Sequence, residues 1–339
     1  MVINKLGIIQ QGGTPLEFTN IADPTPGEGE ILIKVSTCGV CHTEMDEIEG
    51  RTPPPILPMI PGHQIIGRVI DMGGTGTNLA IGQRVGVGWI HFACGKCEFC
   101  LSKRENLCVD FLATGRDAHG GYAEYMVIPS AFCYQIPDSI SDIESAPMLC
   151  AGAIGYRSLI LADIQDGEPI GLTGFGSSGH LVLKLARHLY PNSEVFVFSR
   201  NPKEMEFAME LGAAWAGEID ASPPTLLNSI IETTPAWKPI IKGLENLKPG
   251  GRLIINAIRK ENIDNDWLQQ LDYSKHLWME KEIKSVANVT RSDITQFLNL
   301  AVRFDIRPLT TVYSLSDANR AIFDLKFRKT QGAGVLVVE

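Results

Sequence analysis

The sequence predicts an α/β protein in which a β-rich domain is joined to a doubly wound parallel sheet with helices. The chain has 339 residues, and because one hydrophobic core rarely extends over so many, two domains of about 150 residues each are expected. Residues 29–127 read as short β-rich runs punctuated by Gly and Pro, whereas strands alternate with helical stretches after Pro147. The first pattern is typical of an all-β unit and the second of a parallel sheet.

The β-rich part rests on apolar runs bounded by turn residues. These runs are ILIKVST, HQIIGRVI and RVGVGW. The later part begins with a strand in PIGLTG, a helix in HLVLKLARHL, a strand in EVFVFS and a helix in PKEMEFAMELGA, with a further strand in GGRLIINAI. Such an order predicts right-handed βαβ units. Near the C-terminus, SDITQFLNLAVRF predicts a helix and AGVLVVE a closing strand.

Composition excludes several partners. Hydrophobic residues make up 44% of the chain and charged residues 20%, which is ordinary for a globular protein. The net charge of −9 and the lack of a basic run give no reason to expect nucleic acid or an anionic membrane as a partner. We see no signal peptide in MVINKLGIIQ and no segment approaching the ~18 to 20 apolar residues of a membrane span, so a cytoplasmic protein is expected.

Four of the eight cysteines form a dense cluster with the pattern C-x2-C-x2-C-x7-C. They are Cys94, Cys97, Cys100 and Cys108. Four thiolates within so short a loop can surround Zn²⁺ as a tetrahedron, and an iron–sulfur cluster is the chemical alternative. With all four positions occupied by thiolate, none is left for substrate, so this spacing predicts a structural metal.

A glycine pattern between a strand and a helix predicts a dinucleotide site. Gly174, Gly176 and Gly179 give G-x-G-x-x-G, which allows a tight turn, close approach of the pyrophosphate and close packing of helix on strand. The next strand ends in Ser199 and Arg200, without the acidic residue that binds the ribose hydroxyls of NAD. Since a guanidinium suits a phosphate, we expect NADP(H) to be preferred over NAD(H).

Three further candidate residues are dispersed: Cys41 in CHTE, His63 in PGHQ and Cys150 in APMLCAG. Their spacing alone does not join them. However, CGVCHTE, PGHQ, the four-cysteine pattern, GGYAEY, LCAG and GFGSSG occur in the order found in one family. The chain thus resembles the zinc-dependent alcohol dehydrogenases of the medium-chain dehydrogenase/reductase superfamily over nearly its whole length.

The resemblance implies an organisation and an activity. A GroES-like catalytic domain would comprise residues 1–150 and 289–339, and a Rossmann domain residues 151–288. The activity would be hydride transfer between an alcohol or aldehyde and a nicotinamide dinucleotide. Family resemblance also implies a homodimer or homotetramer and two Zn²⁺ ions per chain.

The resemblance assigns individual roles as well. Cys41, His63 and Cys150 would ligate a catalytic zinc whose fourth position takes water or substrate oxygen. Thr43 would hydrogen-bond that oxygen and begin a proton path, and Glu44 would orient a ligand. His42 would belong to the cofactor-binding residues and Trp89 would narrow the alcohol pocket.

Three positions depart from the family pattern. Gln64 stands where the family commonly has Glu after the zinc-binding His, which removes a negative charge near the metal. Asp46 stands where many members have a relay His, which changes the outer part of the proton path. The C-terminal QGAGVLVVE lacks an Arg that many members use to contact the cofactor.

Two other functions remain open at this stage. A zinc-free quinone or alkene reductase of the same superfamily would share the fold, but the presence of all three catalytic ligands speaks against it. A non-catalytic sensor would retain the cofactor fold without turnover. The physiological alcohol does not follow from the sequence, because one methylene changes discrimination by only ~1 to 3 kcal/mol.

Overall fold

The computed structural model describes residues 1–74 and 77–338. The chain folds into two compact units. The first comprises Met1–Cys150, Val289–Val302 and Arg307–Glu339, and the second comprises Ala151–Asn288 and Arg303–Ile306. The chain passes from the first unit to the second between residues 150 and 151 and returns after residue 288, and residues 303–306 also belong to the second unit.

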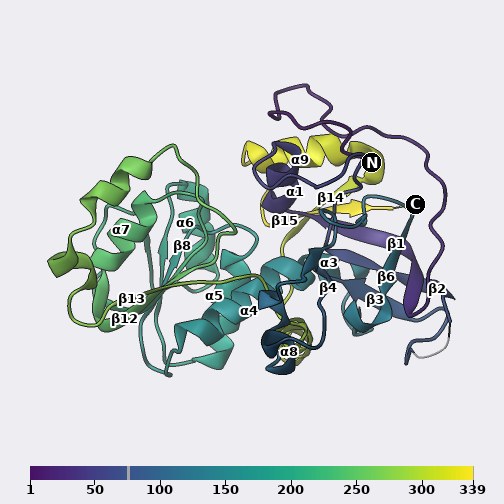
Figure 1. Ribbon diagram of the computed structural model, residues 1–339. Helices are drawn as coiled ribbons and strands as arrows, with labels where there is room; N and C mark the ends of the chain where they lie inside the picture. Colours follow the sequence, from purple (N-terminus) through teal and green to yellow (C-terminus); the bar gives the residue numbers. More distant parts are fainter. Residues whose placement is uncertain (75–76, 339) are drawn as a thin grey trace. The chain divides into compact units, whose positions relative to one another are not determined.

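The first unit is built on a seven-stranded sheet with the order β14-β15-β1-β2-β3-β7, in which β6 also pairs with β1. Only β14 and β15 run parallel; every other pair is antiparallel. The strands are β1 (Glu30–Val40), β2 (Ile65–Met72), β3 (Arg84–Val87), β6 (Tyr125–Pro129), β7 (Cys133–Gln135), β14 (Thr310–Ser314) and β15 (Ala333–Val337). The C-terminal strand β15 therefore lies directly beside β1 (Figure 1).

Short elements surround this sheet and hold the cysteine-rich loop. They are the two-stranded sheet β4 (Ile90–Phe92) and β5 (Leu112–Ala113), and the helices α1 (His42–Ile48), α2 (Glu98–Leu101), α3 (Asp142–Pro147), α8 (Arg291–Arg303) and α9 (Ala318–Lys326). Buried positions of β1 alternate with more exposed ones, so that Ile31, Ile33 and Val35 enter the core. The predicted strands, the predicted helix α8 and the closing strand are confirmed, although Glu339 lies outside the described residues.

The second unit is a six-stranded parallel sheet of order β10-β9-β8-β11-β12-β13. Its strands are β8 (Ile170–Thr173), β9 (Val195–Phe198), β10 (Trp215–Gly217), β11 (Leu227–Glu232), β12 (Leu247–Ile255) and β13 (Glu282–Ser285). Its helices are α4 (Ala153–Ala162), α5 (Gly179–Leu189), α6 (Pro202–Glu210) and α7 (Lys238–Glu245), which surround the sheet (Figure 1). In chain order the strands are arranged 3-2-1-4-5-6, which is the Rossmann topology, and the predicted βαβ units are confirmed.

One helical stretch, Asp142–Ala162, is long and apolar enough by length and composition to cross a membrane. The sequence analysis expected no run of apolar residues long enough for a membrane span, and this stretch meets that test by length and average composition only. However, 67% of its most apolar window is buried inside the protein, as in the core helix of a folded domain. The stretch also carries Asp142, Glu144 and Arg157. Its length alone therefore places no part of the chain in a membrane.

Candidate active site

Cys41 lies where the central strand of the first unit gives way to a helix. It follows β1 as the N-cap residue of α1, with an extended backbone at φ −133° and ψ 165°. The Glu44 carboxylate folds back and accepts a hydrogen bond of 2.7 Å from the Cys41 backbone N–H. This capping arrangement satisfies a helix N-terminus and fixes the direction of the Cys41 side chain. The positive end of the helix dipole also favours a thiolate there.

Glu44 connects the cap to His63. Its Oε1 atom lies 2.7 Å from His63 Nδ1, and both side chains are almost fully buried. Because Nδ1 faces the carboxylate, Nε2 is the ring nitrogen that remains available for a metal. The structure thus places the Glu44 carboxylate in contact with Nδ1 of a predicted ligand.

Cys150 lies in a π-helical turn, Met148–Gly152, between α3 and α4. Such turns widen the helix locally and are frequent at functional sites. The ligand atoms of Cys41, His63 and Cys150 all lie within 4.8 Å of one another. Two thiol groups and one imidazole at this spacing match the donor set of a zinc site with an open fourth position.

The directions in which the pKa values of these three groups are shifted indicate that the cluster suits a cation. A hydrogen bond from Cys150 lowers the pKa of Cys41, and the same contact raises the pKa of Cys150 well above its usual range. Burial lowers the pKa of His63, but the charges and hydrogen bonds of Glu44 and Cys41 together outweigh burial and raise it well above its usual range. Without a cation, therefore, one buried thiolate suppresses ionisation of the second thiol and the imidazole retains a proton. A divalent ion supplies the positive charge that both thiolates need.

Thr43 and Trp89 border the three ligands. The Thr43 hydroxyl is buried and lies 3.7 Å from Cys41 Sγ. The Trp89 ring meets the His63 ring edge to face, with 4.9 Å between centroids. Both predicted residues therefore lie at the metal site, and Trp89 packs directly against a ligand.

The two departures in this unit have structural partners. Asp46 is buried and paired with Arg51, whose Nε donates a hydrogen bond of 2.7 Å to its carboxylate. Gln64 is buried against β1, where a Cβ added to Gly39 would lie only 2.7 Å from Gln64 Oε1. Both polar side chains are thus built into the scaffold around the ligands.

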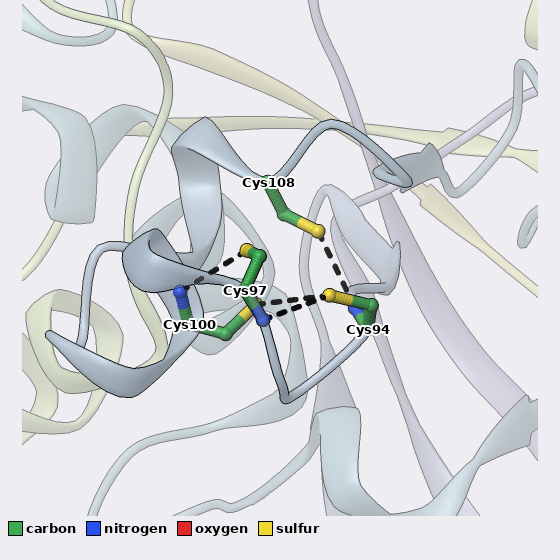
Figure 2. A group of neighbouring side chains, drawn as sticks. All are labelled: Cys94, Cys97, Cys100 and Cys108. Carbon is green, nitrogen blue, oxygen red and sulfur yellow. Dashed lines mark hydrogen bonds between the residues drawn. The ribbon is translucent and has the colours of Figure 1, made fainter.

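The four-cysteine cluster lies apart in sequence from those ligands, in the loop around α2. All four sulfurs lie within 4.8 Å of one another, and Figure 2 shows them turned toward a common centre. Three backbone N–H groups donate to sulfur: Cys94 N to Cys108 Sγ at 3.4 Å, Cys97 N to Cys94 Sγ at 3.4 Å, and Cys100 N to Cys97 Sγ at 3.5 Å.

Two pKa values in the four-cysteine cluster also indicate that it suits a cation. Backbone N–H groups of Lys96 and Cys97 lower the pKa of Cys94 to about 7. Burial and the neighbouring thiols raise the pKa of Cys100 to about 12. Cys94 Sγ and Cys100 Sγ are only 3.9 Å apart, so both ionise together only when a positive charge lies between them. The donor set and its convergence fit a tetrahedral metal with no open position.

The glycines of the second unit have the geometry that the motif requires. Gly174 has a φ of +83°, which favours glycine in this turn, and a Cβ on Gly179 would lie 2.7 Å from Gly174 O. A Cβ on Gly176 would meet nothing within 4 Å, which leaves room for a ligand to approach the backbone. The turn leads into the N-terminus of α5, whose N–H groups favour an anion.

The remaining cofactor candidates are divided between the two units. Ser199 and Arg200 follow β9; Ser199 is buried and Arg200 is exposed. His42 is exposed at the first residue of α1, in the other unit. The structure therefore keeps Arg200 and His42 accessible to a ligand.

Two acidic residues near the candidate sites escaped the sequence analysis. Glu47 is fully buried on α1, and neither carboxylate oxygen has a hydrogen-bond partner among the described residues. Glu204 contacts Ser199 from helix α6. The signal for Glu204 was its place in the first turn of a helix after Asn201, a good N-cap, since an acidic residue there can reach back toward the cap.

A Rossmann sheet with a glycine-rich turn, together with a Cys, His, Cys ligand set, defines a metal-dependent dinucleotide oxidoreductase. Residues 27–138 match the alcohol dehydrogenase GroES-like domain family. The chain is 38% identical to the probable alcohol dehydrogenase AdhA of Mycobacterium tuberculosis (strain CDC 1551 / Oshkosh), over 96% of this chain and 93% of the relative.

Solved structures agree with this match. The chain is similar to a cinnamyl alcohol dehydrogenase from Sorghum bicolor, with a TM-score of 0.82 and 26% identity over 94% of this chain and 92% of the other. It is also similar to a CAD from Helicobacter pylori complexed with NADP(H), with a TM-score of 0.80 and 23% identity over 92% and 91%.

The chain therefore belongs to the zinc-dependent alcohol dehydrogenase family of the medium-chain dehydrogenase/reductase superfamily. It is an NAD(P)-dependent alcohol oxidoreductase with a GroES-like and a Rossmann domain, and it acts on small alcohols or aldehydes. The comparisons give no support to a zinc-free alkene reductase or to a non-catalytic sensor.

Proposed function

We propose that this alcohol dehydrogenase holds two Zn²⁺ ions per chain with different roles and prefers NADP(H) to NAD(H). The convergence of Cys41, His63 and Cys150 within 4.8 Å supports the catalytic ion most directly. Three protein ligands leave one position for substrate, whereas the four cysteines of the second cluster leave none. The first ion would therefore serve catalysis and the second would serve folding.

The roles of the residues follow from their positions. When bound, the catalytic zinc supplies Lewis-acid polarisation of the alcohol or aldehyde oxygen, and the nicotinamide accepts or supplies the hydride. Glu44 holds His63 in one orientation through its 2.7 Å contact with Nδ1. Thr43 Oγ1 can accept a proton from a substrate hydroxyl while donating its own, since a hydroxyl does both at once. Trp89, packed on His63, would shape the apolar wall beside the substrate.

The cofactor preference rests on the end of β9. Ser199 is the first residue after the strand, and Arg200 follows with an exposed side chain. Among the described residues, no ion pair engages that guanidinium, which leaves its planar donors available for a 2′-phosphate. Charge-assisted contacts of this kind contribute on the order of 1.5 to 3 kcal/mol, or roughly ten- to hundredfold in specificity.

Metal analysis combined with kinetics tests the proposal. The purified protein should contain two zinc ions per chain and give a higher kcat/KM with NADP(H) than with NAD(H). Cys150→Ala should lose one ion and turnover while keeping its melting temperature within a few degrees. Cys97→Ala should lose the other ion together with thermal stability or oligomer integrity. Wild-type turnover in Cys150→Ala would show that the catalytic ligands are wrongly assigned.

We also propose a cytoplasmic homodimer or homotetramer. The edge strand β13 is exposed along its whole length, and apolar side chains on it and in the segment that precedes it are exposed as well. These are Tyr273, Trp278, Met279 and Ile283. An unpaired strand edge rimmed by apolar groups supports pairing with a second copy. Light scattering at micromolar concentration should give a mass of at least twice 37.1 kDa.

A further inference from the structure

The end of β9 carries an acidic group that the local sequence does not show. Ser199 is only 7% exposed, and its hydroxyl donates a hydrogen bond of 2.6 Å to Glu204 Oε2. The same hydroxyl oxygen accepts a hydrogen bond of 3.1 Å from the Asn201 backbone N–H. Ser199 is therefore occupied both as a donor and as an acceptor.

Helix α6 delivers this carboxylate by ordinary capping geometry. Asn201 is the N-cap, with its side chain accepting from Lys203 N, and Pro202 occupies the first helical position. Glu204 is thus the third helical residue, where the helix dipole favours a negative charge. From this position its side chain reaches back to the strand end. The strand ends without an acidic residue, yet an acidic side chain lies beside it.

The location matters because Rossmann enzymes read the 2′ position of the adenosine ribose at the end of this strand. A carboxylate there repels a 2′-phosphate at short range and accepts hydrogen bonds from a ribose hydroxyl. Ser199 has a single hydroxyl proton, so it cannot donate to Glu204 and to a phosphate at the same time. A phosphorylated cofactor must therefore displace the contact between Ser199 and Glu204.

We propose that Glu204 is a specificity-determining residue that opposes binding of the 2′-phosphate and limits the preference for NADP(H). Arg200 attracts the phosphate and Glu204 repels it, so the observed preference is the difference between two opposing charges. The inference rests on the proposed function in one respect: the 2′ substituent of the cofactor's adenosine ribose must bind beside Ser199. It holds whichever of the two cofactors the wild-type enzyme prefers.

Glu204→Gln is the sharpest test, because it removes the charge while keeping the shape and an oxygen that accepts from Ser199. Glu206→Gln is the matched control, since Glu206 lies on the same helix with an exposed side chain. Binding to the intact enzyme is measured by calorimetry with adenosine 2′,5′-bisphosphate and with 5′-AMP, which need no chemistry at the metal. The kcat/KM values for NADPH and NADH provide a second readout.

Glu204→Gln should increase the affinity for adenosine 2′,5′-bisphosphate by about tenfold relative to that for 5′-AMP. This factor is at the lower end of the range for a charge-assisted contact. The kcat/KM ratio of NADPH to NADH should rise by the same factor, through KM and not through kcat. The gain should shrink as salt is raised, because screening weakens the repulsion. Glu206→Gln should change the ratio less than twofold.

An unchanged or lower ratio in Glu204→Gln, with an unaltered melting temperature, would overturn the inference. An equal gain in Glu206→Gln would also overturn it, because the effect would then come from net charge alone. The proposed cofactor preference fails separately, if wild-type enzyme uses NADH as well as NADPH. If Glu204→Gln does not fold, Glu204→Thr, which also lacks the charge, replaces it. The same calorimetric and kinetic assays are then used, and the same changes in affinity and in the kcat/KM ratio are expected.

Discussion

We expect the buried His180 to make the stability of the second unit depend on pH. It follows Gly179 in the first turn of α5, is fully buried, and has Nδ1 2.9 Å from Gly176 O. Burial lowers the pKa of His180 to about 4, against an ordinary value of 6.5. The folded protein therefore keeps this ring neutral at pH values where the unfolded chain protonates it.

The sign and size of the effect follow from this difference. Between pH 6.5 and about 4 the unfolded state binds more protons than the folded state, so stability falls as pH falls through that window and is fully present above it. At about 1.4 kcal/mol per pKa unit, the interval corresponds to about 3.5 kcal/mol in total. About 2 kcal/mol of this should already be lost at pH 5.

Urea unfolding at pH 7 and pH 5 measures the loss when His180→Asn is compared with wild type. The Asn amide can still donate to Gly176 O but takes up no proton, so the variant should lose about 2 kcal/mol less than wild type. His188→Asn is the control, because His188 is exposed and stacked on Phe304. Loss of zinc in acid affects all three proteins alike. Parallel losses in all three would refute the reasoning.

Three further predictions concern the metal site and the cofactor. Thr43→Val should lower kcat by about 10² to 10⁴. Asp46→Ala should lower kcat less, since Arg51 already pairs with Asp46. Equal and small losses of kcat in both variants would mean that the proton path runs through other residues. Burial raises the pKa of Glu47 well above its usual range, so the folded protein loses stability as pH rises through that pKa. Glu47→Gln should therefore have a higher melting temperature than wild type at pH 9 but not at pH 5. A difference in melting temperature that does not depend on pH would contradict this. Ser199→Asp combined with Arg200→Ile should reverse the cofactor preference in kcat/KM, and an unchanged preference would show that these residues do not read the 2′ position.

Local patterns predicted the fold well because each one reports on a few neighbouring residues. The alternation in β1 and the amphipathic run that became α5 need only the pleat and the helical repeat to be interpreted. The four-cysteine spacing is equally local, since its loop brings the sulfurs together without distant contacts.

The catalytic ligands are different in kind. Cys41, His63 and Cys150 come from a helix cap, a loop and a π-helical turn that the chain brings together only after folding. No spacing rule relates them, so their grouping came from family resemblance. Glu204 was missed for the same reason on a smaller scale, because a helix cap returns a side chain to a strand end five residues earlier.

Helix α1 shows how tertiary context overrides composition. Its sequence HTEMDEI is acidic enough to predict a solvated surface helix, yet residues 43–48 are all buried. Glu44 and Glu47 lie three residues apart on one helix face, and the charge of Glu44 raises the pKa of Glu47 further. Glu44 faces His63, so its charge is offset by the imidazole and, when present, by the metal. Glu47 has no hydrogen-bond partner among the described residues, and the charges of His63 and Arg116 offset its burial only in part.

This crowding gives a physical reason for Gln64. A carboxylate at this position would add another buried acid directly after His63, in a unit where α1 already buries Glu44, Asp46 and Glu47. Burial already raises the pKa of Glu44 and of Glu47, so a further buried carboxylate would be costly to ionise. An amide keeps the size of the side chain and its packing against Gly39 while adding no charge. Gln64 therefore adds no negative charge to a unit in which α1 already buries several acidic side chains.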